Sequence, residues 1–268
     1  MSSLINMMYH FVGIDKKFKG TTLKDFNFQL DYLQKNYENN KLFLTFDHGT
    51  IDHYEIVRPE LEKRNLKGIF FIMTIVPEEE EIPSIDKQRF LEGNYRKELV
   101  TFVCDQLNLN YCPIESKTYL KHLTFYSDEE RHLRFLRDTI IPKIDFEKVI
   151  TKIFNSMFGN EKDFVKNNYM DWTQIKRLKD NGHIIGSHSH SHVGNFNDYK
   201  KSFELLDNNL KIENRLISYP NGNNLLNDIE LKELNINSGY ISNNNGDTMY
   251  NIGRIDDKFF NLVKSLKD

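Results

Sequence analysis

Residues 42–50, LFLTFDHGT, decide the fold. The run at 42–46 is short, apolar and rich in aromatic residues, which is typical of a strand buried on both faces. A polar loop is expected at 47–50, followed by a helix to about Arg64 and a second apolar strand at 68–73. A strand, a helix and a strand in this order indicate a parallel sheet with helices on its outside.

The same pattern extends on both sides of this stretch. An apolar strand is predicted at 5–9, and a helix at 22–37 begins with Thr22 as its N-cap. The second half repeats the order: helix 172–181, strand 183–187, helix 198–211, strand 215–219, short strands near 239–242 and 251–255, and a final helix near 257–267. The sequence therefore predicts the α/β class.

The middle of the chain differs from both halves. Residues 79–168 carry few strand signals, and the acidic run EEEEIPSID at 78–86 is expected to be a solvated loop. Periodic stretches at 96–107, 128–141 and 145–158 predict helices. We expect one domain over residues 1–268, with a mainly helical insertion or lid at about 79–168.

Composition excludes several classes of protein. The chain has 268 residues, with 39% hydrophobic and 28% charged residues, which suits a folded domain. A net charge of -3 with mixed signs indicates no general surface for nucleic acid or membrane. No apolar stretch approaches the about 20 residues of a membrane span, and the first residues lack a secretory signal, so we expect a cytoplasmic location. Cys104 and Cys112 lie outside any CxxC pair and are interpreted as reduced thiols. The oligomeric state stays open.

Three histidines gather at residues 186–192, GSHSHSH, directly after a predicted strand. His188 and His192 are four residues apart, so a helical turn there would project both imidazoles from one face. Two such nitrogens can bind one zinc ion at about 2.0–2.1 Å. His190 would then point away, in a structural or supporting role. The alternative is a polar surface loop with exposed histidines.

A carboxylate and an imidazole, Asp47 and His48, follow the strand at 42–46. The carboxyl end of a parallel strand is the usual position for chemistry in such sheets. Asp47 could instead cap the next helix. Taken with His188 and His192, His48 would complete three protein ligands, which is what a catalytic zinc needs besides an open position for water.

These two segments resemble the motifs of the NodB-type polysaccharide deacetylases, whose first motif is usually Thr-Phe-Asp-Asp-Gly and whose second pairs two histidines. The resemblance implies a distorted (β/α) barrel, with Asp47 as general base and His188 and His192 as metal ligands. His48 stands where the family has its second, metal-binding Asp. Imidazole is a competent zinc ligand, but the exchange leaves the metal's double charge without a ligand carboxylate.

Three further positions rest on the same resemblance. Residues 218–222, SYPNG, are most similar to the third motif of the deacetylases of biofilm poly-N-acetylglucosamine, which implies that the backbone N–H of Tyr219 helps to hold an oxyanion. Residues 8–10, MYH, resemble an element of that branch and imply that His10 is the general acid. Arg254 resembles a later arginine and would keep Asp47 ionised.

Each of these three positions also has an ordinary interpretation. Residues 218–222 would by themselves be a Pro-Gly turn after a strand. His10 and Arg254 would be surface residues. His53, His122 and His132 show no pattern of partners and are expected to be solvated.

The resemblance implies a metal-dependent hydrolase that removes an N-acetyl group from a sugar or glycan intermediate, in surface polysaccharide biosynthesis. Zinc is the default metal, and nickel or cobalt also suit a histidine site. Two alternatives stay open: a catalytically inactive glycan-binding protein of the same fold, and an amidase that acts on a non-sugar C–N bond.

Overall fold

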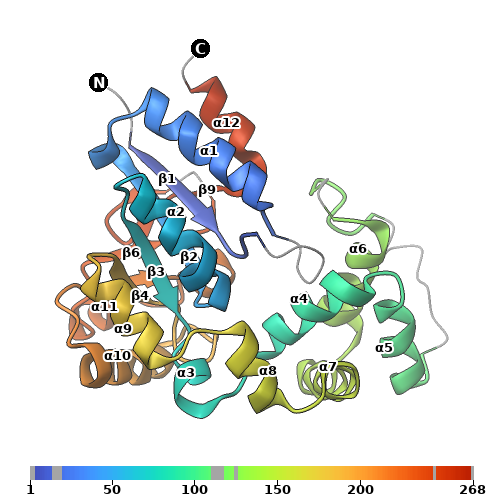
Figure 1. The fold of residues 1–268 in the computed structure, drawn as a ribbon. Coiled ribbons are helices and arrows are strands. Elements are labelled where there is room, and N and C mark those ends of the chain that lie inside the picture. Colours follow the sequence, from blue (N-terminus) through green and yellow to red (C-terminus); the bar gives the residue numbers. More distant parts are fainter. Residues whose placement is uncertain (1–3, 14–19, 110–117, 124–125, 244–245, 267–268) are drawn as a thin grey trace. The chain divides into compact units, whose positions relative to one another are not determined.

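The sheet is almost entirely parallel. The computed structural model describes residues 4–13, 20–109, 118–123, 126–243 and 246–266. Within them the strands form one nine-stranded sheet in the order β7-β8-β6-β5-β4-β3-β2-β1-β9, which curls into a half-barrel (Figure 1). Only the β7–β8 pair is antiparallel among the described strands. The α/β class expected from the sequence is confirmed.

The strands are β1 (Ile5–Tyr9), β2 (Leu42–His48), β3 (Gly68–Ile72), β4 (Ile184–Ser187), β5 (Leu216–Ser218), β6 (Ser238–Tyr240), β7 (Asp247–Thr248), β8 (Asn251–Ile252) and β9 (Ile255–Asp256). The helices of the same part of the chain are α1 (Leu23–Asn36), α2 (Arg58–Lys63), α3 (Ile75–Glu79), α9 (Trp172–Asp180), α10 (Phe196–Leu210), α11 (Asp228–Glu233) and α12 (Phe260–Ser265). A π-helical segment, His53–Val57, leads into α2.

Three aromatic rings set the register of the first strands. Tyr9 lies opposite Phe46 on β2, and Phe46 lies opposite Phe70 on β3. The ring of Phe46 stacks on Tyr9 with centroids 5.3 Å apart and on Phe70 at 4.9 Å. A slip by one residue would turn every side chain of a strand to the other face, so this stack fixes which residues end each strand.

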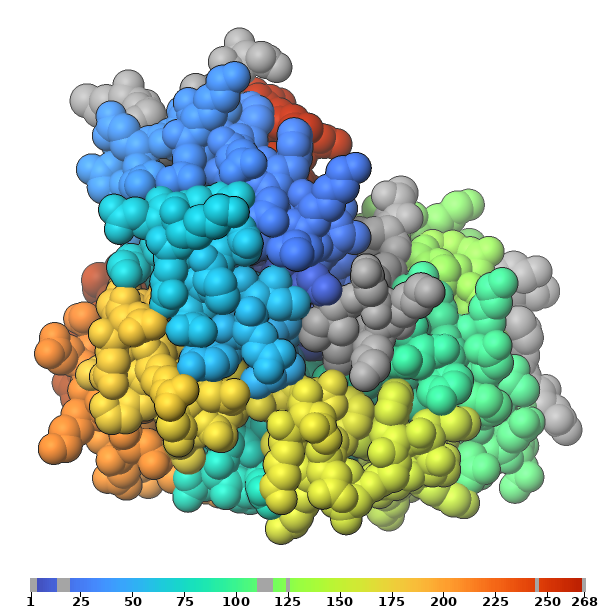
Figure 2. Space-filling model, viewed as in Figure 1, coloured from blue at the N-terminus to red at the C-terminus, as the bar shows by residue number. Residues whose placement is uncertain are grey.

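Helix α1 shows how the local sequence builds the outer layer. It begins at Thr22, whose hydroxyl accepts the backbone N–H of Asp25 at 3.1 Å. Its buried residues include Phe26, Leu30 and Leu33, which follow the helical spacing and face the sheet. The helix lies beside α12 (Figure 1). In Figure 2, α1, α2 and α9 cover the sheet on the face shown.

Contacts divide the described chain into two compact units. The sheet and its helices belong to residues 4–13, 20–81 and 165–266, and residues 82–164 form the other unit. The described part of this second unit is helical, with α4 (Ser84–Tyr95), α5 (Leu99–Leu107), α6 (Asp128–Phe135), α7 (Lys143–Phe158) and the start of α8 (Glu161–Asn168). Its core includes Phe90, Phe154 and Phe164, whose rings meet edge to face.

Two expectations about local structure are wrong. Strand β2 runs through Asp47 and His48, which the sequence analysis placed in a loop, because both side chains are buried. The acidic run at 78–86 is only partly a loop: α3 ends at Glu79, α4 begins at Ser84, and Asp86 is fully buried. The sequence pattern did not predict the start of α4, because this helix buries polar as well as apolar residues.

Two further features concern the chain as a whole. Cys104 lies in α5, whereas Cys112 lies outside the described residues. None of the described helices combines the length and the apolar character needed to cross a membrane.

Asp257 makes the stability of the fold depend on pH. Burial, and then the nearby charge of Asp256, raises the pKa of Asp257 from 3.8 to about 7. Between these values the folded protein keeps a proton that the unfolded chain releases, so the free energy of unfolding falls as the pH rises from about 4 to about 7. The carboxyl group also contacts the hydroxyl of Thr21.

We expect Asp257→Asn to remove this loss, because an amide has no proton to release. The melting temperature of the variant, measured by scanning calorimetry, should exceed that of the wild type at pH 8, and the difference should shrink toward pH 4. A difference that grows toward acid pH would contradict this assignment.

Candidate metal centre

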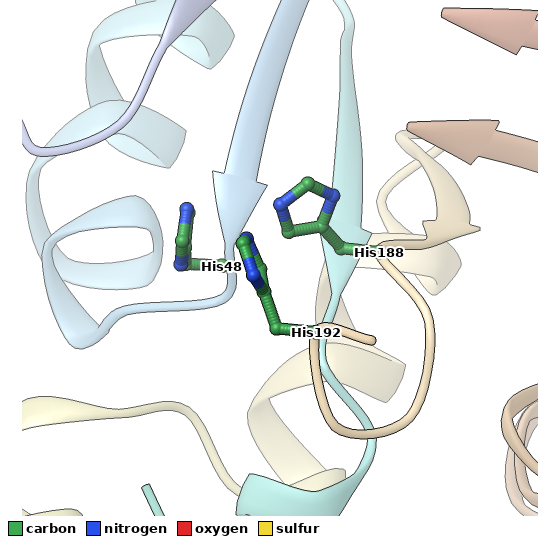
Figure 3. A group of neighbouring side chains, drawn as sticks. All are labelled: His48, His188 and His192. Carbon is green, nitrogen blue, oxygen red and sulfur yellow. The ribbon is translucent and has the colours of Figure 1, made fainter. Parts of the chain in front are cut away.

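Three imidazoles converge at one edge of the sheet (Figure 3). His48 ends β2, and His188 and His192 lie on the loop that leaves β4. One ring nitrogen from each histidine lies within 4.8 Å of the others, and all three residues are buried. The structure thus brings together the three histidines that the sequence singled out, and the group could hold a metal ion.

The backbone at these histidines departs from regular structure. His48 has φ 85° and His192 has φ 64°, both in the left-handed region that non-glycine residues rarely adopt. In a regular strand, residues 47 and 48 would point to opposite faces. The positive φ of His48 interrupts the regular strand conformation at the end of β2. Strain of this kind costs roughly 1–3 kcal/mol per residue, and it concentrates at functional sites.

The loop at 188–192 is not the helical turn that the sequence analysis considered. It contains two left-handed residues, Ser189 and His192, and no helix. The rings of His188 and His192 nevertheless meet, with centroids 4.9 Å apart. The two histidines are therefore brought together by a folded loop and not by the four-residue period of a helix.

A hydrogen bond selects the tautomer of His188. Its Nδ1 lies 2.9 Å from the carbonyl oxygen of Ser218, and a carbonyl can only accept. Nδ1 therefore carries the proton, which leaves the lone pair of Nε2 for a metal. Metal-binding histidines in proteins are generally oriented in this way by a partner on the other ring nitrogen. The donor set thus fits a divalent cation such as zinc.

Asp47 is held by a buried ion pair. Arg254 donates from Nη1 to Oδ1 at 2.8 Å and from Nη2 to Oδ2 at 2.9 Å, and the hydroxyl of Ser218 donates to Oδ2 at 3.0 Å. Asp47 and Arg254 are each 1% exposed. Burial alone would raise the pKa of Asp47, but the charge of Arg254, aided by His188, holds it well below its usual value. Asp47 thus stays ionised and does not cap a helix.

The backbone of Tyr219 does not offer the expected oxyanion donor. Its N–H donates to the carbonyl oxygen of Tyr240 at 3.0 Å, which continues the pairing of β5 with β6. Its hydroxyl donates to the carbonyl oxygen of Tyr250 at 2.8 Å, and burial raises the pKa of this hydroxyl above its ordinary value. Sheet pairing therefore uses the group to which the resemblance gave a catalytic role.

His10 follows β1 and lies beside the three histidines. Its ring centroid is 5.3 Å from that of His48. Two residues at the start of the π-helical turn hold the chain around His10. Nε2–H of His53 donates to the carbonyl oxygen of His10 at 2.7 Å, and the carboxylate of Asp52 accepts the N–H of Val12 at 2.7 Å. His53 was expected to be solvated, but it is fully buried.

Three further histidines take separate places. His122 is exposed and His132 is partly exposed. Nε2–H of His190 donates to Glu79 at 3.1 Å, and Nδ1 lies 3.0 Å from the hydroxyl of Thr74. His190 thus supports the loop from outside the group of three.

Ser218 has a role that its place in the sequence did not predict. Its carbonyl oxygen holds His188 and its hydroxyl holds Asp47, so one residue joins the group of three histidines to the ionised carboxylate. The position of Ser218, a polar residue at the end of an apolar strand, could have predicted this role, since Asp47 occupies the same kind of position.

No family model and no curated protein matches the sequence. Several solved structures are similar to the structure of this chain. Streptococcus pyogenes deacetylase PplD, in complex with acetate, is 15% identical with a TM-score of 0.53, and the match covers 95% of this chain and 92% of PplD. IcaB from Ammonifex degensii is 14% identical with a TM-score of 0.55, over 99% and 97% of the two chains. A polysaccharide deacetylase from Bacillus cereus is 12% identical with a TM-score of 0.50, over 95% and 65%. The expected NodB-type distorted (β/α) barrel is confirmed as the fold.

Removal of Arg254 should destabilise the protein strongly. Arg254→Met leaves the buried charge of Asp47 without its partner, and breaking a buried pair in this way costs about 3–5 kcal/mol. The double variant Asp47→Asn/Arg254→Met should lose much less. Urea unfolding measures both, with Arg177→Met as a control because Arg177 is exposed. Equal losses for Arg254→Met and Arg177→Met would contradict the assigned role of the pair.

Proposed function

We propose that this chain is a metal-dependent carbohydrate N-deacetylase, a hydrolase that releases acetate from an N-acetylated sugar. One observation carries the proposal: one ring nitrogen from each of three buried histidines lies within 4.8 Å of the others, beside a carboxylate that Arg254 keeps ionised. The fold shared with solved deacetylases supports it, and so does the acetate bound to one of them.

His48, His188 and His192 would hold a divalent cation. Zinc is the default choice, and nickel or cobalt would also suit three imidazoles. Such a cation would supply a Lewis acid that acidifies a water molecule and polarises the acetyl oxygen. Its charge is not balanced by a ligand carboxylate, and the charge of Asp47 is already offset by Arg254. We therefore expect weaker metal binding than with an Asp at position 48.

Asp47 would accept the proton of the attacking water. Arg254 and Ser218 fix the orientation of its carboxylate before substrate arrives. A base positioned in this way contributes about 10²–10⁴-fold to rate. Its low pKa makes it a weak base by itself, so its role depends on a water molecule that is already acidic.

His10 would donate a proton to the departing sugar nitrogen. It is only partly buried, and its ring lies beside His48. The proposal assigns no role to the N–H of Tyr219, because the sheet uses it. The substrate would be an N-acetylated sugar or glycan intermediate of surface polysaccharide biosynthesis.

Metal content separates the ligands from the base. We expect the purified wild type to bind one equivalent of zinc, and His188→Ala or His192→Ala to lose it, as measured by plasma mass spectrometry. Asp47→Asn should keep the metal, because Asp47 is not a ligand. If His48→Ala keeps full metal content and full activity, the proposal of three histidine ligands is wrong.

Acetate release tests the activity itself. Metal-loaded protein incubated with oligomers of N-acetylglucosamine should release acetate, as measured by a coupled enzymatic assay. Asp47→Asn should lower the rate by about 10²–10⁴-fold. Tight binding of the oligomers without metal or acetate release would favour a glycan-binding protein instead.

A further inference from the structure

The loop that carries two of the three histidines is fixed in two separate halves. The first half is held by the end of β3. The N–H of His188 donates to the carbonyl oxygen of Ile72 at 2.9 Å, and the N–H of Ile75 donates to the carbonyl oxygen of His190 at 3.0 Å. These bonds continue the sheet and fix His188. They do not reach His192, whose left-handed backbone has to be set in another way.

A single carboxylate holds the second half. Asp198 accepts the backbone N–H groups of Ser191 at 3.0 Å, Val193 at 3.0 Å and Gly194 at 2.9 Å, and the hydroxyl of Ser191 at 2.8 Å. These donors belong to the residue before His192 and to the two residues after it. The loop is thus wrapped around Asp198, and His192 lies at its turn.

Asp198 is itself anchored by the helix on which it lies. Asn195 is the N-cap of α10, and its side chain accepts the N–H of Asp198 at 3.0 Å. Asp198 therefore lies in the first turn of α10, where a negative charge is favoured. Burial would raise its pKa, but the hydrogen bonds from the loop lower it, so the carboxylate is charged.

The number of donors explains why this position needs a carboxylate. An ionised carboxylate has two oxygens and about four acceptor positions, and here four donors use them. An asparagine offers one oxygen, and its NH₂ group would face backbone N–H groups that also donate. Replacement would leave one side of the turn at His192 without acceptors.

We propose that Asp198 is a positioning residue that sets the loop so that the imidazole of His192 completes the metal centre. This inference rests on the proposed function, since it assumes that the three histidines bind a metal. Asp198 itself does not bind the metal. It acts through the backbone on both sides of His192, in the way that residues around a ligand shell tune metal affinity in other proteins.

Titration of the metal-free, full-length protein tests this inference. Co²⁺ binding is followed by its visible absorption, and the Kd for Zn²⁺ is measured by competition with a chelator. The variants are Asp198→Asn, Ser191→Ala, which removes one donor and leaves the carboxylate, and Asp207→Asn as the matched control. Asp207 also lies on α10, but its partner is Arg215, which does not belong to the histidine loop.

We expect Asp198→Asn to bind Zn²⁺ about 10- to 100-fold more weakly than the wild type. Its Co²⁺ spectrum should also change, because one imidazole is displaced. The Kd of Ser191→Ala for Zn²⁺ should lie between those of the wild type and Asp198→Asn, and the Kd of Asp207→Asn should equal that of the wild type. A purely structural role would lower the melting temperature of Asp198→Asn yet leave the Kd and spectrum of the folded protein unchanged.

The outcomes separate the two proposals. A wild type that binds neither Co²⁺ nor Zn²⁺ overturns the proposed function and this inference with it. A wild type that binds, together with a folded Asp198→Asn variant of equal affinity, overturns this inference alone. If Asp198→Asn does not fold by circular dichroism, Ser191→Ala decides: weaker binding than the wild type supports the inference, and wild-type affinity overturns it.

Discussion

An ionised carboxylate cannot remain in a protein interior without a partner, and Asp47 is such a carboxylate. Its partner, Arg254, lies 207 residues further along the chain. The pair therefore joins the second strand of the sheet to the segment that precedes β9. Ser218, at the end of β5, bonds both members of the pair and also orients His188. The site can form only when β2, β5 and the segment before β9 are in place, which makes this ion pair the link between fold and chemistry.

The parallel strands place the side chains of the candidate site at one edge of the sheet. Stacking of Tyr9, Phe46 and Phe70 fixes the register of the first three strands, so that His10, directly after β1, and Asp47, near the end of β2, lie at neighbouring strand ends. In open parallel sheets this carboxyl edge is where ligands bind. His48 and His192 then depart from regular backbone conformations. The regular strands determine where the site lies, and the left-handed backbone at His48 and His192 determines the directions of their imidazole rings.

The sequence predicted those features that depend on local pattern. Apolar runs predicted β1, β2 and β3, and Thr22 predicted the start of α1. The resemblance to known motifs assigned the three histidines and Arg254 to one site. It failed where long-range contacts decide. Burial of Asp47 and His48 extended β2, packing against Phe46 and Phe70 buried His53, and pairing with β6 used the N–H of Tyr219. Nothing in the sequence indicated the role of Asp198, because three of its four donors are backbone N–H groups, which any residue but proline carries.

The central claim is that three imidazoles surround one cation. X-ray absorption spectroscopy at the zinc edge tests it most directly, since it reports the ligands of the metal in solution. The account predicts three imidazole nitrogens at about 2.0–2.1 Å, with one further light atom from water. A shell of oxygen atoms without the scattering pattern of imidazole, or fewer than three histidines per zinc in the intact protein, would contradict it.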